Sequence, residues 1–315
     1  MTSRKFVFRS VAATLLLVAG VLSVNIYINE FGLFGDVRGE EYRVHAYEKT
    51  TKYLFSYNYI PSNFEGILVG PSFGDQMMDT RKIEHHRIYN LSMDGSNISE
   101  LKFAIDNVLK YGDIKYFLIC LDPYITRDSG RKSSQIDPRE YYATLGSLFL
   151  PQYYRKKHLE IKKGSESPYH DSSWGYTDNT FEKKDFNTSL MINYRVADIE
   201  KNKNFTITID PVAYLELSEI VNELRKKKIQ ILAYYYPHPK RFFEKKNYKR
   251  EYKGYQEKIG KLLDQQKDII IDFNQEKYDY IRGIDTSYSD GGHLSAEGAK
   301  KLLAVLSKEL NALSK

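Results

Sequence analysis

The chain has 315 residues and a formal net charge of +6 at pH 7, and 28% of its residues are charged. This excess of basic residues is modest for the length and comes from lysines scattered along the sequence, which disfavours nucleic acid as a partner. Because Cys120 is the only cysteine, an internal disulfide and a cysteine-based metal site are excluded.

An apolar segment near the amino terminus predicts a membrane anchor. Residues 10–28 contain no charged side chain and are long enough to span a bilayer. Basic residues precede the segment and acidic residues follow it, so we expect a cytoplasmic tail at 1–9, a transmembrane helix at 10–28 and an extracytoplasmic chain beyond it. A cleaved signal peptide is the alternative, but Ser23-Val24-Asn25 is a poor cleavage site.

The order of strands and helices predicts the fold class. After a connector at 29–62, apolar strands alternate with helical patterns through residues 63–315, which is typical of a parallel sheet covered by helices. Strands are expected from Gly66 onward and at 87–93, 116–121, 229–236 and 268–273, and helices at 99–111, 210–227, 247–265 and 295–313. We therefore predict an α/β domain with a five-stranded parallel sheet.

Residues 125–208 interrupt this alternation and are interpreted as an insertion. They have no clear period, and they contain many tyrosines and the only tryptophan, Trp174. Long irregular segments in a compact domain are usually functional or disordered, and the aromatic content favours a substrate wall or lid. Packing of these rings against the core is the alternative. The aromatic residues concerned are Tyr141, Tyr142, Tyr153, Tyr154, Tyr169, Trp174 and Tyr176.

Ser72 is the candidate nucleophile. It follows the first strand, stands between Gly70-Pro71 and Gly74, and precedes a helix expected to open at Asp75. A serine at the carboxyl end of a strand and the amino end of a helix has backbone N–H groups nearby that favour a developing negative charge. This position suits acyl transfer, and a purely structural turn is the alternative.

A base and an acid for Ser72 are found near the other end of the chain. A serine hydroxyl is a weak nucleophile until a base takes its proton, and the neutral imidazole of His293 can do so near pH 7. Asp290, three residues earlier, can hold the other ring nitrogen of the histidine. The alternative for this pair is a helix-capping loop with a surface histidine.

These segments, in this order, resemble the blocks of the SGNH (GDSL-like) hydrolase and acyltransferase superfamily. Gly70-Pro71-Ser72 is similar to the first block, residues 90–95 to the second, and Asp290-Gly291-Gly292-His293 to the last. The resemblance covers residues 64–124 and 208–313. The chain departs from the pattern at Pro71, where aspartate is common, and at Asp122-Pro123-Tyr124, where the family usually has an asparagine.

The resemblance implies a three-layer α/β/α sandwich of the flavodoxin-like kind and a Ser72, His293 and Asp290 triad. It also implies an oxyanion hole in which backbone N–H groups of Ser72 and Gly95 and the side chain of Asn97 stabilise the charge. The third oxyanion donor of the family is in doubt here because Asp122 replaces asparagine. No cofactor and no metal are implied.

Three residues are candidates for substrate binding. His238 sits at the carboxyl end of a predicted core strand, where sites in open parallel sheets collect. Tyr124 follows another such strand, and Trp174 belongs to the insertion. By contrast, the adjacent histidines His85 and His86 point to opposite faces if they lie on a strand, so we do not expect a metal site there.

The combination of anchor and triad indicates a function. A membrane-tethered, outward-facing protein of this type resembles the bacterial enzymes that move acyl groups, commonly acetyl, onto cell-envelope polysaccharides. In that role it would use a polysaccharide acceptor and an acyl donor supplied by a membrane-bound acyltransferase partner. A carbohydrate esterase of the same fold is one alternative. A non-catalytic polysaccharide-binding or assembly factor is another.

The predicted topology can be tested with a reporter fused to the carboxyl terminus. Since the basic flank precedes the apolar segment, the reporter should be active only outside the cytoplasmic membrane. Cytoplasmic activity of the same fusion would contradict both the anchor and the cell-envelope function.

Overall fold

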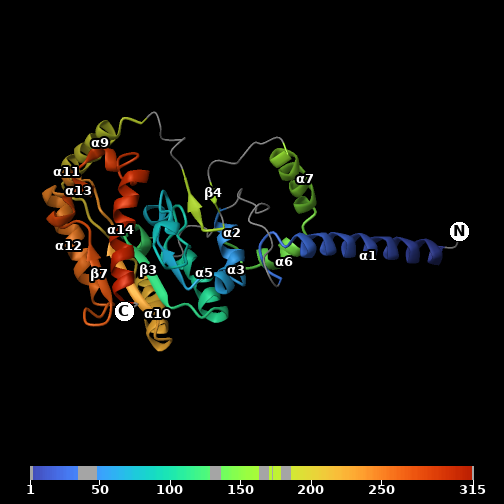
Figure 1. Ribbon diagram of the computed structural model, residues 1–315. Coiled ribbons are helices and arrows are strands. Elements are labelled where there is room, and N and C mark those ends of the chain that lie inside the picture. Colours follow the sequence, from blue (N-terminus) through green and yellow to red (C-terminus); the bar gives the residue numbers. More distant parts are fainter. Residues whose placement is uncertain are drawn as a thin grey trace.

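The structure is a computed structural model that describes residues 3–34, 48–127, 136–162, 170–171, 173–178 and 186–313. Its first element, helix α1 (Ser3–Ile28), projects away from the rest of the chain (Figure 1). The mean hydropathy of its most apolar window is 2.2, and only 6% of that window is buried. The helix is therefore long and apolar enough to span a membrane or to act as a signal anchor.

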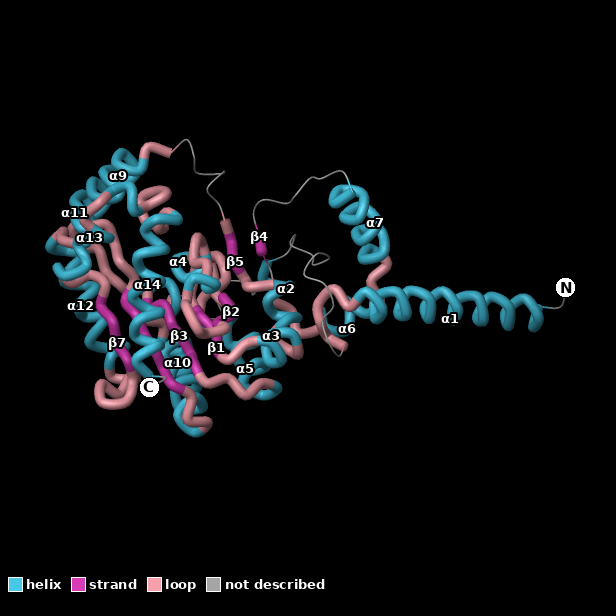
Figure 2. The backbone as a smooth tube through the Cα atoms, viewed as in Figure 1, coloured by secondary structure: helices cyan, strands magenta, loops and turns pink. Residues whose placement is uncertain are grey.

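A single parallel sheet forms the centre of the domain, as predicted from the sequence. Its strand order is β2-β1-β3-β6-β7, and every neighbouring pair is parallel. Figure 2 shows the strands in magenta with helices around them. The strands are β1 (Gly66–Val69), β2 (Ile88–Asn90), β3 (Tyr116–Leu121), β6 (Gln230–Tyr235) and β7 (Ile269–Asp272). The predicted α/β class with a five-stranded parallel sheet is confirmed.

Helices are found at the four ranges 99–111, 210–227, 247–265 and 295–313 where the sequence predicts them, and the domain also contains short helices that were not predicted. Those of the core are α2 (Glu48–Phe55), α3 (Tyr59–Asn63), α4 (Ser72–Asp75), α5 (Ile98–Tyr111), α10 (Pro211–Lys226), α11 (Lys240–Phe243), α12 (Lys246–Gly260), α13 (Asp279–Arg282) and α14 (Ala296–Leu313). The helix expected to open at Asp75 is wrong. The helix starts at Ser72 and ends at Asp75, because Gln76 is already extended (φ −68°, ψ 128°) and Met77, with a φ of +63°, cannot resume a helix.

Both faces of the sheet are buried, because alternate side chains of its strands enter two separate hydrophobic clusters. Ile67 and Val69 of β1 belong to the cluster that contains the buried faces of α5, α10 and α12. Leu68, which lies between them, belongs to the cluster that contains the buried face of α14. Strands buried on both faces explain the continuous apolar runs in the sequence.

The insertion contains short elements rather than one irregular loop. They are α6 (Glu140–Leu145), α7 (Phe149–Lys162), β4 (His170–Asp171), β5 (Tyr176–Thr177) and α9 (Thr188–Lys201). At one end, the side chain of Asn25 in α1 donates to carbonyl groups of Thr144 and Leu145 at 3.3 and 2.7 Å. At the other end, α9 packs beside α11 and α12. The insertion therefore connects the end of the apolar helix to the domain.

The tight packing of the turn that follows β1 can be tested with glycine substitutions. A methyl group at Gly70 would lie 2.6 Å from Cβ of Cys120, so Gly70→Ala should lower the free energy of unfolding by about 1–3 kcal/mol. The matched control is Gly254→Ala on the exposed face of α12, where no atom lies within 4 Å, and it should raise stability by about 0.5–1 kcal/mol. Thermal unfolding in detergent measures both, and equal stability of the two variants would contradict the tight packing.

Candidate active site

Ser72 lies at the carboxyl end of β1, in a turn that two glycines allow. We call residues 70–75 the serine turn. In addition to the close approach of Gly70 to Cys120, a methyl group at Gly74 would lie 2.7 Å from Oγ of Ser92. The backbone of the serine turn is thus in direct contact with its neighbours in the sheet. The Ser72 residue itself stays partly exposed at the carboxyl end of the strands.

The structure brings Ser72, His293 and Asp290 together in one chain of hydrogen-bond contacts. Nε2 of His293 lies 3.0 Å from Oγ of Ser72, and Nδ1 of the same ring lies 2.8 Å from Oδ2 of Asp290. The other carboxylate oxygen accepts the backbone N–H groups of Gly292 and His293 at 2.7 and 2.8 Å. With a carboxylate beside Nδ1, the ring proton is held there and Nε2 can accept the proton of the serine.

The loop that carries His293 is held from two sides. The hydroxyl of Tyr236, after β6, donates to the carbonyl of Gly292 at 3.1 Å. Nη1 of Arg195, on α9 of the insertion, donates to the carbonyl of Gly291 at 2.6 Å. The insertion therefore supports the position of the histidine, a role that the sequence did not suggest.

Two of the predicted oxyanion donors have N–H groups available. Among the described residues, neither the backbone N–H of Ser72 nor that of Gly95 donates to a protein acceptor. Gly95 has a φ of +62°, which glycine adopts without strain. Both groups lie in segments that follow neighbouring strands, β1 and β2, at the same edge of the sheet.

The prediction that Asn97 completes the oxyanion hole is not supported by its contacts. Its Oδ1 accepts the N–H of Glu100 at 3.2 Å and caps α5. Its Nδ2 donates to the carbonyl of Arg127 at 3.1 Å. Both polar ends of the side chain thus hold the start of α5. Asp122, at the position of the family's asparagine, offers a carboxylate, which accepts hydrogen bonds and does not donate them.

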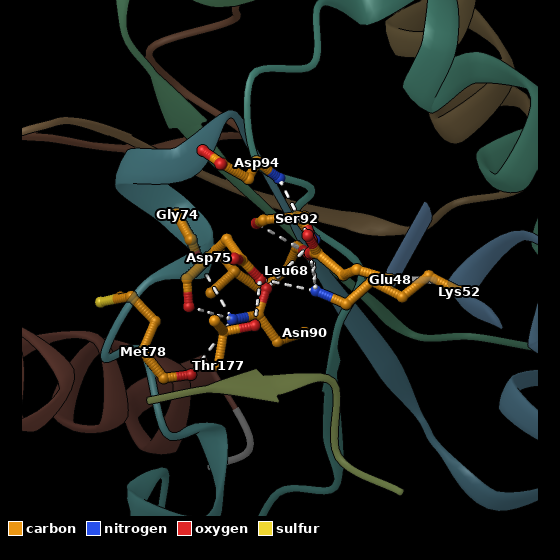
Figure 3. Close-up of polar contacts among 10 residues, drawn as sticks. All are labelled: Glu48, Lys52, Leu68, Gly74, Asp75, Met78, Asn90, Ser92, Asp94 and Thr177. Atoms are coloured by element: carbon orange, nitrogen blue, oxygen red, sulfur yellow. Dashed lines mark hydrogen bonds and ion pairs between the residues drawn. The ribbon is translucent and has the colours of Figure 1, made fainter. Parts of the chain in front are cut away.

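A buried lysine that the sequence analysis missed contacts the serine turn through Asp75 (Figure 3). Nζ of Lys52 in α2 lies 2.6 Å from Oδ1 of Asp75 and 2.9 Å from Oε1 of Glu48, and it also donates to the carbonyl of Ser92. These three acceptors satisfy the three N–H groups of the ammonium. Although burial opposes the charge of Lys52, attraction to Asp75 and Glu48 raises its pKa. Burial and the nearby Glu48 raise the pKa of Asp75 well above its ordinary value.

Asn90 at the end of β2 also holds this turn. Its side-chain amide lies 3.0 Å from the carbonyl of Gly74, 3.3 Å from that of Asp75 and 3.1 Å from that of Met78 (Figure 3). Its Oδ1 accepts the N–H of Ser92. One fully buried side chain therefore satisfies the backbone at the end of α4, where the helix stops after one turn.

His238 and Tyr124, two predicted substrate-binding residues, line one cavity of about 240 Å³ beside Phe73. The Phe73 ring lies 4.8 Å from the His293 ring, 5.9 Å from His238 and 6.1 Å from Tyr124, measured between centroids. Burial lowers the pKa of His238, although Asp122 opposes this shift. The cavity is thus separated from the serine and histidine pair by a single aromatic side chain.

The structure does not bring Trp174, the third predicted substrate-binding residue, together with His238 and Tyr124. Its ring packs 5.1 Å from that of Phe64, and the Arg87 guanidinium lies 5.1 Å above it. Phe64 and Arg87 precede β1 and β2, whereas Ser72 follows β1, so the ring lies toward the opposite ends of these strands. The tryptophan packs on the core, which was the alternative for the aromatic residues of the insertion.

Of the tyrosines named above for the insertion, the described ones do not line the cavity either. Tyr141 packs on Tyr57, Tyr154 lies near the end of α1, and Tyr176 is beside Met77. Tyr142 is 75% exposed. Tyr169 and the side chain of Tyr153 lie outside the described part of the chain. The insertion instead contributes Arg195, Asp198 and Phe205 to the cavity.

Of the two adjacent histidines, His86 is buried and has structural contacts, whereas His85 is exposed. Nδ1 of His86 lies 2.9 Å from Oε1 of Glu65, and its ring packs on Tyr116. In the part of the chain that the structure describes, no group of three or more histidine, cysteine, aspartate or glutamate side chains could hold a metal ion.

Comparison with known proteins identifies no family. No protein-family model matches the chain, and no curated protein matches it. The functional interpretation therefore rests on the geometry of the site.

The buried lysine makes a testable contribution to stability. Lys52→Met leaves two carboxylates without their cation in a site where Lys52 is 3% and Asp75 0% exposed, so it should cost about 3–5 kcal/mol of unfolding free energy. The control is Lys102→Met, which breaks a pair whose side chains are 27% and 54% exposed and should cost at most about 1 kcal/mol. Similar losses in denaturant unfolding would mean that Lys52 does not hold the serine turn.

Proposed function

We propose that this protein is an SGNH-type serine acyltransferase that acts on a polysaccharide outside the cytoplasmic membrane of a bacterium. The observation that carries the proposal is the contact chain from Ser72 through His293 to Asp290 at the carboxyl edge of a parallel sheet. Supporting observations are the strand order, which is that of flavodoxin-like sheets, and the hydrophobic clusters on both faces, from which we infer a three-layer α/β/α sandwich.

The proposed reaction has two half-reactions. His293 Nε2 takes the proton of Ser72 as Oγ attacks the carbonyl carbon of the acyl donor, and the N–H groups of Ser72 and Gly95 stabilise the oxyanion. The donor's leaving group departs with the proton from His293, and an acyl-serine remains. In the second half, a sugar hydroxyl gives its proton to His293 and attacks the acyl-serine. Collapse of this intermediate releases the acylated sugar and restores Ser72.

The apolar helix α1 fits a role at the membrane. It would hold the domain close to a membrane-bound acyltransferase partner that supplies the acyl group, commonly acetyl. No cofactor or metal takes part in the proposed steps.

A carbohydrate esterase is the second candidate, and one observation favours it. The His293 side chain is 23% exposed and Ser72 is partly exposed, so water can reach an acyl-serine in this structure. Water and a sugar hydroxyl use the same acyl-enzyme, and the two activities differ only in the second half-reaction.

The triad is tested by cleavage of p-nitrophenyl acetate by the full-length protein in detergent. Ser72→Ala and His293→Ala should each reduce turnover by about 10³-fold or more, whereas Asp290→Asn should retain a reduced but measurable activity. The rate losses caused by substitutions within one catalytic unit are not additive. The Ser72→Ala, His293→Ala double variant should therefore be no slower than either single variant.

The control for this experiment is Ser62→Ala, which changes an exposed serine that contacts Asn58 and should keep wild-type turnover. Wild-type turnover by a folded Ser72→Ala variant would exclude the proposed nucleophile and, with it, the acyltransferase and esterase candidates together.

A further inference from the structure

The cavity beside Phe73 has the size of a subsite for one small ring. Its volume of about 240 Å³ lies below the range of roughly 300–1,000 Å³ that is common for drug-sized ligands. Its wall joins the segments after β3 and β6 to α9 and the residues that follow α9. Since Phe73 contacts both the His293 ring and the cavity wall, a group bound here lies next to the acyl-serine site.

The walls of the cavity are largely aromatic. Tyr124, Phe205, Phe242 and Tyr248 line it together with Phe73. Tyr124 is 43% exposed, and the Arg127 guanidinium covers one face of its ring at 3.6 Å. Aromatic walls suit the apolar face of a sugar ring and would equally suit a hydrocarbon chain.

The polar groups of the cavity decide between these two ligands. Nε2 of His238 lies 3.3 Å from Oδ2 of Asp122 and 3.2 Å from the hydroxyl of Tyr248. Nδ1 of the same ring has no hydrogen-bond partner among the described residues, and Oδ2 of Asp122 has no contact other than that to the ring. Both side chains are 1% exposed. Buried polar atoms are normally paired, and a hydrocarbon chain would leave these atoms and the nearby Arg195 desolvated without compensation. Hydroxyl groups would supply the missing partners.

The charges of the cavity favour an uncharged ligand. Arg195 is the only cation among its described lining residues, and Asp122 and Asp198 oppose it with two carboxylates. Nη1 of Arg195 is already bound to the carbonyl of Gly291, and its guanidinium lies 4.3 Å from the centre of the Phe242 ring. A sugar that carries a carboxylate would meet a net negative wall, which costs binding energy.

We propose that this cavity is the acceptor subsite and that it takes one uncharged sugar ring, stacked on its aromatic wall and hydrogen-bonded through its hydroxyl groups. The proposal rests on the proposed function, since it places the hydroxyl that attacks the acyl-serine. It assigns the choice between sugar and water to α9 and the segment that contains Phe205, and not to Trp174.

The test measures how the acetyl group is divided between sugar and water. The full-length protein in nanodiscs is given p-nitrophenyl acetate with methyl glucoside or, in parallel, methyl glucuronide, and mass spectrometry determines the ratio of acetylated sugar to free acetate. Because this ratio is set after the acyl-enzyme forms, a variant that only slows the first half-reaction leaves it unchanged.

Phe205→Ala and Asp198→Asn should each lower the ratio for methyl glucoside by about tenfold, which corresponds to a loss of about 1.4 kcal/mol. The glucuronide should be the poorer acceptor by about fivefold or more, as expected for one unfavourable charge contact. Tyr142→Ala is the control, because this ring is 75% exposed on α6 and lies away from the cavity. Asp198 is exposed, so its substitution tests the cavity even if Phe205→Ala fails to fold.

The outcomes separate this proposal from the proposed function. Suppose that cleavage depends on Ser72, but that neither cavity variant changes the ratio of acetylated sugar to free acetate, or that both sugars are used equally. This result would overturn the acceptor subsite and would still support the proposed enzyme. If no cleavage depends on Ser72, saturation-transfer NMR of methyl glucoside with the same protein decides: a signal that Phe205→Ala removes supports the cavity, and an unchanged or absent signal overturns it.

Discussion

The contact of 3.0 Å between Oγ of Ser72 and Nε2 of His293 joins residues that are 221 positions apart, and the rest of the architecture keeps these two atoms together. The parallel sheet brings the carboxyl ends of β1 and β7, the strands that precede Ser72 and His293, to the same end of the sheet. Two glycines let the serine turn pack closely against β3. The side chains of Lys52 and Asn90 hold this turn through hydrogen bonds. Tyr236 and Arg195 hold the loop that carries His293. The site is therefore positioned by buried groups that take no part in the chemistry.

The departures from the family pattern have different consequences. Pro71 adopts an extended backbone before α4, and its carbonyl accepts the N–H of Gly74 at 2.8 Å, so it is compatible with the serine turn. Asp122 removes an amide donor and places a carboxylate in the cavity wall instead. Loss of one oxyanion donor typically costs about 10²–10³ in rate, which is compatible with an enzyme but favours slow turnover. These positions therefore do not require a non-catalytic protein.

The sequence could predict what depends on periodicity and on neighbours in the chain. Apolar runs such as 116–121 locate the strands, and Asp290 and His293 lie close enough in sequence to suggest their pairing. Lys52 could not be found this way, because its partners Asp75 and Ser92 are distant in sequence and its own segment is polar. The sequence could not place Trp174 for a similar reason, since composition does not tell which end of the sheet a long insertion covers. The short helix that begins at Ser72 ends at Asp75, and Met77, just beyond it, has a positive φ and donates its N–H to the carbonyl of Thr177, a contact that the sequence does not show.

The central claim is that Ser72 carries the acyl group, and the acyl-enzyme itself is the most direct evidence for it. The full-length protein would be mixed with p-nitrophenyl acetate, quenched in acid within the first turnover and digested for peptide mass spectrometry. The account predicts one acetyl group on the peptide that contains Ser72, and none on that peptide in His293→Ala. Cleavage of the ester with the acetyl group on another residue, or with no acetylated serine at any time, would contradict it.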